Sequence, residues 1–96
     1  MSKYRVVETE NNGVYILENA MKKQFSLQIE LYGLASLLKG DIVYLCDELV
    51  DTTSPNFVQP YAFEKCNETD CINIDKNEVM IVERNSKNIL FKRIYG

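Results

Sequence analysis

This chain of 96 residues contains no histidine and no tryptophan. Without histidine it lacks the usual general base at neutral pH, the commonest zinc ligand and the usual partner of a nucleophilic serine or cysteine. Asp47 could still share a catalytic site with Glu48 or Asp51. Two carboxylates held close together raise the pKa of one of them, which suits it to acid–base catalysis. Acids beside a proline-containing loop are usually solvated, so we expect a protein without catalytic function.

Long apolar runs are also missing. No segment approaches the roughly 18 apolar residues of a membrane span. Residues 1–11 are polar and charged where a secretory signal needs an apolar stretch. We therefore expect a cytoplasmic protein that does not engage a membrane.

Cysteine is scarce and odd in number, at positions 46, 66 and 71. In a reducing compartment these residues are expected to remain ordinary thiols. Cys66 and Cys71 lack the second pair that a structural zinc site needs, although Cys46 with an aspartate could complete one, and a disulfide or redox switch is a further alternative. The segment from Asp70 to Glu78 contains side-chain oxygens that could bind calcium, but it lacks the glycine that a calcium-binding loop needs for its sharp turn. We predict no metal and no cofactor.

Charge is distributed unevenly within a formal net charge of −3. The middle of the chain, residues 41–78, is strongly acidic, whereas the end carries a cluster of cations near Phe91 and Tyr95. Single-strand binding surfaces combine cations with aromatic rings in this way, although the acidic middle opposes phosphate binding. The candidate nucleic-acid contacts are Arg84, Lys87, Lys92 and Arg93.

Short apolar runs separated by polar clusters are what the chain does contain, and they are typical of a small all-β domain. Residues 4–10 and 14–18 predict a hairpin that turns through 11–13, with Val7 opposite Leu17 and Thr9 opposite Tyr15. Polar and apolar residues alternate strictly from Gln24 to Leu31, which predicts a strand with one face exposed to solvent.

Leucines at positions 34, 37 and 38 predict one or two helical turns that bury all three side chains. Residues 42–46 predict a strand buried on both faces. We expect a surface loop over 47–60 with a short extended piece at 48–50, a short strand over 61–65 and a polar turn over 67–70. A second hairpin is predicted from 79–83 and 89–94, with Val82 facing Phe91 and Val79 facing Ile94.

The predicted fold is mainly β: one domain over residues 1–96, a small antiparallel barrel or strongly bent sheet of six or seven strands, with one short helix. Three meandering strands, a short helical connection after Gly33 and further strands from 39–41 resemble the OB-fold. That resemblance implies a partly closed barrel, which binds oligonucleotides, sugars or proteins alike. The stretches 13–18 and 91–96 are also similar to small proteins of Gram-positive bacteria, a group that brings no activity.

Six tyrosines are many for so short a chain, and tyrosine suits both half-buried barrel positions and interfaces. We expect a non-catalytic binding module that engages a protein partner or a second copy of itself. An exposed edge strand is its simplest route to a homodimer. Tyr15, Tyr32 and Tyr61 are the candidate interface residues. The alternative is single-stranded nucleic-acid binding through the basic C-terminal hairpin.

Overall fold

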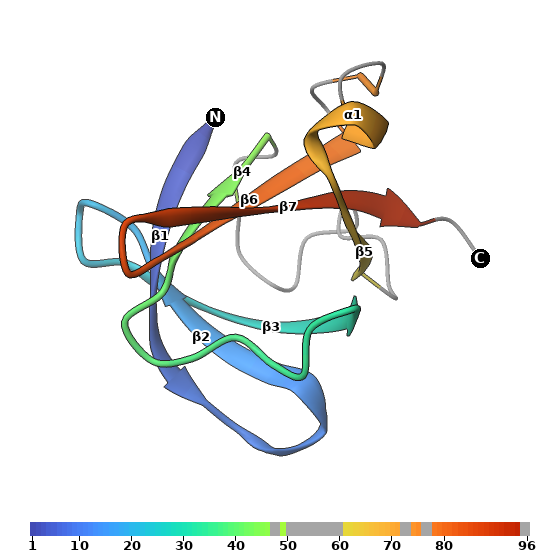
Figure 1. The fold of residues 1–96 in the computed structure, drawn as a ribbon. Helices are drawn as coiled ribbons and strands as arrows, with labels where there is room; N and C mark the ends of the chain where they lie inside the picture. Colours follow the sequence, from blue (N-terminus) through green and yellow to red (C-terminus); the bar gives the residue numbers. More distant parts are fainter. Residues whose placement is uncertain (47–48, 50–60, 72–73, 76–77, 95–96) are drawn as a thin grey trace.

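Seven strands pair in one sheet in the computed structural model, which describes residues 1–46, 49, 61–71, 74–75 and 78–94 (Figure 1). The elements are β1 (Ser2–Thr9), η1 (Asn11–Gly13), β2 (Val14–Glu18), β3 (Gln24–Tyr32), β4 (Ile42–Leu45), β5 (Tyr61–Cys66), α1 (Glu68–Cys71), β6 (Val79–Arg84) and β7 (Lys87–Ile94). The strand order is β1-β2-β3-β5-β7-β6-β4, and β4 pairs with β1 to close a barrel. This confirms the predicted mainly β fold, although β3 and β5 run parallel.

Closure of the barrel gives each of the seven strands a neighbour on both sides. Closure leaves little of the edge that strand addition requires. The pairing is incomplete, since residues 24–28 of β3 pair with β2 alone. The homodimer through an exposed edge strand stays a prediction.

The core follows the alternation that the sequence shows. Phe25, Leu27 and Ile29 on β3 are buried and their neighbours are exposed, as predicted. Strand β4 alternates in the same way, with Val43 and Leu45 buried and Ile42 and Tyr44 half-buried. The prediction of burial on both faces is therefore wrong for this strand.

The first hairpin has its predicted turn but contains an irregularity. Asn12 and Gly13 adopt positive φ in the turn, and Thr9 lies opposite Tyr15 as predicted. The register shifts between Val6 and Glu8, so that Val6 rather than Val7 lies opposite Leu17. A bulge of this kind inserts one extra residue. It lets the buried side chain of Val6 face the core.

The second hairpin has a tighter turn than predicted. Strands β6 and β7 are joined by Asn85 and Ser86, which have φ values of 53° and 63°. Two consecutive residues with positive φ form the turn that best matches the twist of a two-residue hairpin. The shorter turn shifts the register, so Val82 lies opposite Ile89 and Val79 opposite Lys92. The predicted pairing of Val82 with Phe91 is therefore wrong.

Residues 33–41 contain no helix, contrary to prediction. Side chains take the place of helical hydrogen bonds there: the Tyr15 hydroxyl accepts from the N–H of Leu37 at 3.2 Å, and an Asp41 carboxylate oxygen accepts from the N–H of Leu38 at 2.8 Å. Leu37 is buried, whereas Leu38 is half exposed. The leucine spacing therefore reflects a loop that inserts one apolar side chain into the barrel.

The short helix lies instead at 68–71, where the sequence predicts a polar turn. The side chain of Asn67 accepts a hydrogen bond from the N–H of Asp70 at 2.7 Å, as an N-cap residue does. The single turn brings Cys71 back to Cys66, and the two form a disulfide with their Cα atoms 6.2 Å apart. The expectation of ordinary thiols is wrong for this pair.

The strand predicted over 61–65 is confirmed as β5. The predictions for 47–60, apart from Leu49, lie outside the described residues. Within the part of the chain that is described, neither helical segment has the length and apolar character needed to cross a membrane.

Candidate binding surfaces

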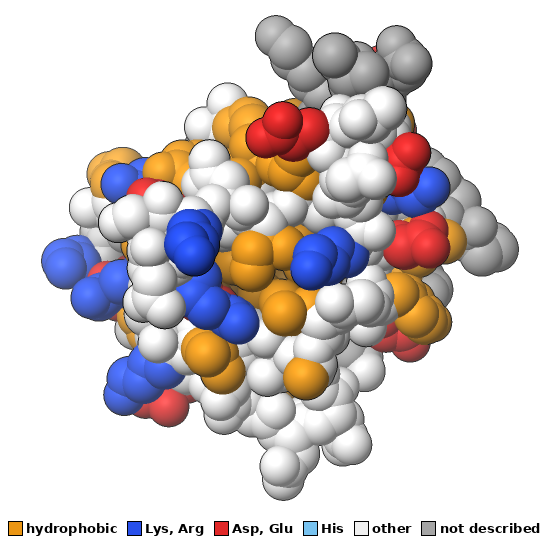
Figure 2. Space-filling view, in the orientation of Figure 1, with side chains coloured by type: hydrophobic (Ala, Val, Ile, Leu, Met, Phe, Trp, Pro, Cys, Tyr) orange, Lys and Arg blue, Asp and Glu red, His pale blue; other side chains and the backbone are white. Residues whose placement is uncertain are grey.

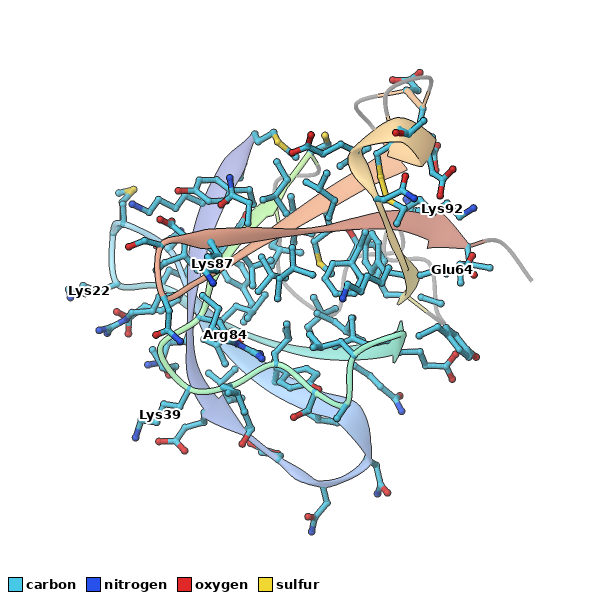
Figure 3. The ribbon with its side chains drawn as sticks, viewed as in Figure 1. Lys22, Lys39, Glu64, Arg84, Lys87 and Lys92 are labelled. Atoms are coloured by element: carbon cyan, nitrogen blue, oxygen red, sulfur yellow. A yellow bond between two sulfur atoms is a disulfide. The ribbon has the colours of Figure 1, made fainter. Side chains whose placement is uncertain are left out.

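Three connections meet at one end of the barrel: the β2–β3 turn, the segment before β4 and the β6–β7 turn (Figure 1). Their cations share that end, where Lys22, Lys39, Arg84 and Lys87 are labelled in Figure 3. We call this surface the basic end. Its cations are Arg5, Lys22, Lys23, Lys39, Arg84 and Lys87.

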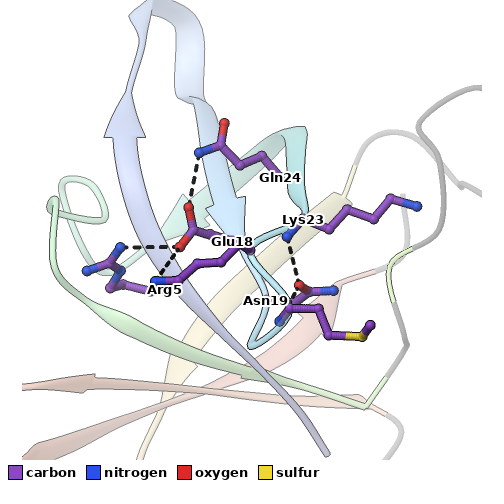
Figure 4. Close-up of polar contacts among 7 residues, drawn as sticks. Arg5, Glu18, Asn19, Lys23 and Gln24 are labelled. Atoms are coloured by element: carbon purple, nitrogen blue, oxygen red, sulfur yellow. Dashed lines mark hydrogen bonds and ion pairs between the residues drawn. The ribbon is translucent and has the colours of Figure 1, made fainter.

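The centre of the basic end is the carboxylate of Glu18 (Figure 4). It accepts hydrogen bonds from Gln24 Nε2 at 3.1 Å and from Arg5 at 3.3 Å, and Lys22 lies 3.6 Å away. The hydrogen bond from Gln24, followed by the positive charges of Lys22 and Arg5, lowers the pKa of Glu18. Glu18 therefore stays ionised and orients the cations around it.

The β2–β3 turn is shaped by the side chain of Asn19. Its oxygen accepts hydrogen bonds from the backbone N–H groups of Met21 and Lys23, both at 3.0 Å (Figure 4). This local bonding is typical of Asn in turns. The ammonium of Lys23 lies 5.4 Å from the ring centroid of Phe25, and Lys22 adopts a positive φ of 68°. The turn thereby presents Lys22 to solvent.

The segment before β4 is fixed by a buried ion pair. The guanidinium of Arg84 donates to both oxygens of Asp41, at 2.9 and 2.7 Å, and to the carbonyl of Ser36 at 3.1 Å. Asp41 is 3% exposed. The hydrogen bonds to Asp41 raise the pKa of Arg84 above its usual range. This arrangement fixes residues 36–41 on the β6–β7 hairpin.

Two carboxylates of the basic end are enclosed, whereas Glu8 is 61% exposed. Six cations face four carboxylates, Glu8, Glu18, Asp41 and Glu83. The side chains of Glu18 and Asp41 are 12% and 4% exposed, whereas those of Lys22 and Lys39 are 79% and 70% exposed. In Figure 2 the blue side chains gather on the left of the molecule, and most red ones lie toward its upper right. The basic end is thus positive although the whole chain carries −3.

Two shallow hollows of about 420 and 360 Å³ lie side by side on this surface and share Arg5 and Glu18 in their walls. The larger also reaches Lys39 and Gly40, and the smaller extends over Ala20 and Ile42. Their cationic walls suit carboxylates or phosphates.

The four cations predicted to contact nucleic acid do not share one surface. Arg84 and Lys87 lie opposite each other beside the β6–β7 turn, whereas Lys92 lies toward the far end of β7 (Figure 3), 3.7 Å from Glu64. The guanidinium of Arg93 lies 4.9 Å from the ring centroid of Tyr61. The structure therefore brings together two of the four, and these belong to the basic end.

The three tyrosines predicted at a protein interface also differ in position. Tyr15 and Tyr61 are core residues, 4% and 5% exposed, whereas Tyr32 is 54% exposed. The Tyr15 hydroxyl binds the backbone of Leu37, which accounts for its burial. Of these three, Tyr32 is the ring that offers a surface to a partner.

A second surface lies on the outer face of the barrel. Paired residues of adjacent strands place Tyr44 beside Ile81 and Ile81 beside Leu90, all half-buried. The row continues to Lys3 on β1 and Cys66 on β5. We call these five residues the outer row. Its middle is apolar, and it crosses five of the seven strands of the barrel.

Sequence reasoning identified two cations of the basic end, Arg84 and Lys87, and missed the rest of that surface and the outer row. The cations of the basic end come from four separate segments, and only their positions in or beside predicted turns were visible. Among the described residues, no cluster of three potential metal ligands is present. Comparison with protein families, curated proteins and solved structures finds no match to this chain, so these surfaces have to be interpreted from their chemistry alone.

Proposed function

We propose that this protein is a non-catalytic binding module whose basic end takes an acidic segment of a protein partner. The observation that carries the proposal is the convergence of exposed cations from separate connections on one end of a closed barrel. Complementary charge steers association and fixes orientation. The two hollows beside Arg5 provide a concave surface for such a segment, with cationic side chains and apolar side chains in their walls.

The layout supports an OB-like interpretation of the fold. A three-strand meander, pairing of β1 with β4 and parallel pairing of β3 with β5 are features that this interpretation requires. The hairpin of β6 and β7 would then be an addition to that barrel. A bacterial, cytoplasmic protein remains part of the same proposal, on the sequence features that suggested it.

Single-stranded nucleic-acid binding has less support than an acidic protein segment. Binding of that kind stacks bases on exposed aromatic rings. Tyr4 and Phe25, beside the basic end, pack edge to face with centroids 6.0 Å apart, and both are buried. Tyr44 is half-buried, and its hydroxyl donates to Glu83 at 3.3 Å. Lys92, one of the cations on which this alternative depends, faces a carboxylate at the far end of β7.

Fluorescence anisotropy with two labelled probes tests the proposal: a glutamate-rich peptide and an oligo-thymidylate of equal charge. At physiological ionic strength we expect the peptide to bind the wild-type protein, with an affinity that falls as salt is added. The double variant Lys22→Glu and Lys39→Glu should lose this binding. Lys65→Glu with Lys92→Glu, which makes the same charge change elsewhere, should retain it.

Equal loss of peptide binding in both double variants would show that net charge alone controls binding, and would overturn the proposed site. Tighter binding of the oligonucleotide than of the peptide would overturn the protein-partner proposal in favour of nucleic acid. Circular dichroism of each variant verifies that the barrel remains folded.

A further inference from the structure

The disulfide between Cys66 and Cys71 closes the first part of the connection from β5 to β6. It joins cysteines five positions apart and encloses α1, beside which Figure 3 draws the bond between the two sulfur atoms. Both cysteines are partly exposed, and residues 67–70 between them are exposed. A small thiol compound can therefore reach the bond while the barrel is folded, and accessible disulfides are the ones that exchange readily.

The α1 turn has little besides the disulfide to hold it closed. Its four residues bury no side chain. Asn67 caps it, since its side-chain oxygen accepts the N–H of Asp70 at 2.7 Å and its carbonyl accepts the N–H of Cys71 at 3.0 Å. A helix of this length is not stable by itself, because its nucleation costs more than its few hydrogen bonds return. The order of residues 67–71 therefore depends on the covalent bond.

The barrel does not depend on the bond in the same way. Cys66 is the last residue of β5, where it lies opposite Leu90 of β7. The buried residues of β5 lie at the other end of the strand, at 61–63. Opening of residues 67–71 would thus leave the core and the strand pairs in place. Local opening without global unfolding is expected where a segment buries little apolar surface.

The third cysteine lies too far away to exchange with this pair. Cys46 follows β4, and its sulfur lies 3.9 Å from the carbonyl oxygen of Val79. Strands β6 and β7 stand between β4 and β5 in the sheet. Three strand spacings amount to roughly 14 Å along the sheet. The redox state of Cys66 and Cys71 is therefore set by an external thiol or disulfide.

We propose that the Cys66–Cys71 disulfide is a redox switch whose reduction opens residues 67–71 while the barrel stays folded. A thiolate of an external dithiol attacks one sulfur and displaces the other cysteine as a thiolate. The second thiol of the dithiol then attacks the mixed disulfide and displaces the remaining cysteine. Two electrons and two protons pass to the cysteines, and the dithiol becomes a cyclic disulfide. The reverse exchange closes the turn again.

The switch controls the order of a segment that carries two exposed carboxylates, Glu68 and Asp70. In Figure 1, α1 lies at the upper right, whereas the β2–β3 and β6–β7 turns of the basic end lie at the left. The inference uses none of the cations of the basic end. It therefore goes beyond the proposed function, and either proposal can fail without the other.

Amide hydrogen exchange before and after treatment with dithiothreitol, without denaturant, tests the switch. We expect the reagent to convert Cys66 and Cys71 to thiols, as counted by alkylation and mass spectrometry. Exchange at the amides of Asp70 and Cys71 should then become roughly tenfold faster or more, because their hydrogen bonds to Asn67 open. The amides of β3 and β7 should stay protected, and oxidised dithiothreitol should restore the slow exchange.

Two variants separate the bond from the reagent. Cys71→Ser should show the fast exchange at Asp70 without any reductant, and Cys46→Ser should respond to dithiothreitol like the wild type. Unchanged exchange at residues 70 and 71 after reduction would overturn the switch. A bond that is reduced only in denaturant, or strand amides that lose protection together with residues 67–71, would overturn it as well. An altered response of Cys46→Ser would overturn its assignment to this pair of cysteines.

Discussion

Arg84 and Asp41, 43 positions apart in the chain, are joined by two hydrogen bonds of 2.9 and 2.7 Å. The carboxylate also accepts the N–H of Leu38, and the guanidinium also reaches the carbonyl of Ser36. The pair therefore holds the segment before β4 against the last hairpin. It links the stability of the barrel to the shape of the basic end.

Removing the guanidinium should leave a buried charge without its partner. We expect Arg84→Met to lower the free energy of unfolding by about 3 kcal/mol, since breaking a buried pair is costly. Lys87→Met, at the exposed cross-strand partner of Arg84, should stay within about 0.5 kcal/mol of wild type. Urea unfolding followed by circular dichroism measures both. Equal losses in the two variants would contradict a specific role for the pair.

The lowered pKa of Glu18 predicts a dependence of stability on pH. Because this carboxyl binds protons less readily in the folded state than in the unfolded state, its contribution is present at neutral pH and is lost as the pH falls below about 4.5 and through the folded-state pKa. Glu18→Gln should flatten this part of the stability profile. Urea midpoints measured at a series of acidic pH values verify it. An unchanged acid profile would contradict the assignment.

The β6–β7 turn places Ser86 at a positive φ of 63°. Glycine adopts this conformation without the steric cost that a Cβ atom causes. Ser86→Gly should therefore raise the free energy of unfolding by about 0.5 kcal/mol, and Ser86→Val should lower it by about 1 kcal/mol or more. Thermal unfolding of the two variants gives opposite shifts if the two-residue turn is present. A shift in the same direction would indicate a longer loop.

The disulfide between Cys66 and Cys71 predicts a specific thiol count. Titration of the unreduced, unfolded chain with a thiol reagent should detect only the thiol of Cys46, and reduction should expose the other two. Closing so short a loop stabilises the fold by roughly 2 kcal/mol in the chain-entropy account. Cys71→Ser should lose up to that amount in denaturant unfolding. Three reactive thiols before reduction would contradict the bond.

Much of the fold could be predicted because burial on a strand follows an alternation that is visible along the chain. The pattern of Phe25, Leu27 and Ile29 specifies a strand with one buried face before any partner is known. The predicted helix over 34–38 failed for the opposite reason. Its backbone N–H groups bind the hydroxyl of Tyr15 and the carboxylate of Asp41, and the position of Tyr15 relative to this segment depends on the assembled barrel.

The candidate site was less predictable than the fold. A basic run after Glu83 was visible, yet the structure divides it between the two ends of β7. Register explains the division, since Arg84 and Lys87 are cross-strand partners at the turn while Lys92 pairs with Val79. The cations of the basic end come from connections that become neighbours only when the sheet closes.

The chain by itself determined that the protein is a small β domain, because alternating apolar side chains can be buried only on one face of a strand. It also supplied residues that tolerate positive φ at the turns, Asn12 and Gly13 among them. Tertiary structure alone decided that the sheet closes, which cations gather at one end and which apolar residues remain on the outside. These outcomes depend on pairing between strands distant in sequence, and that pairing is fixed by the packing of all seven strands around one core.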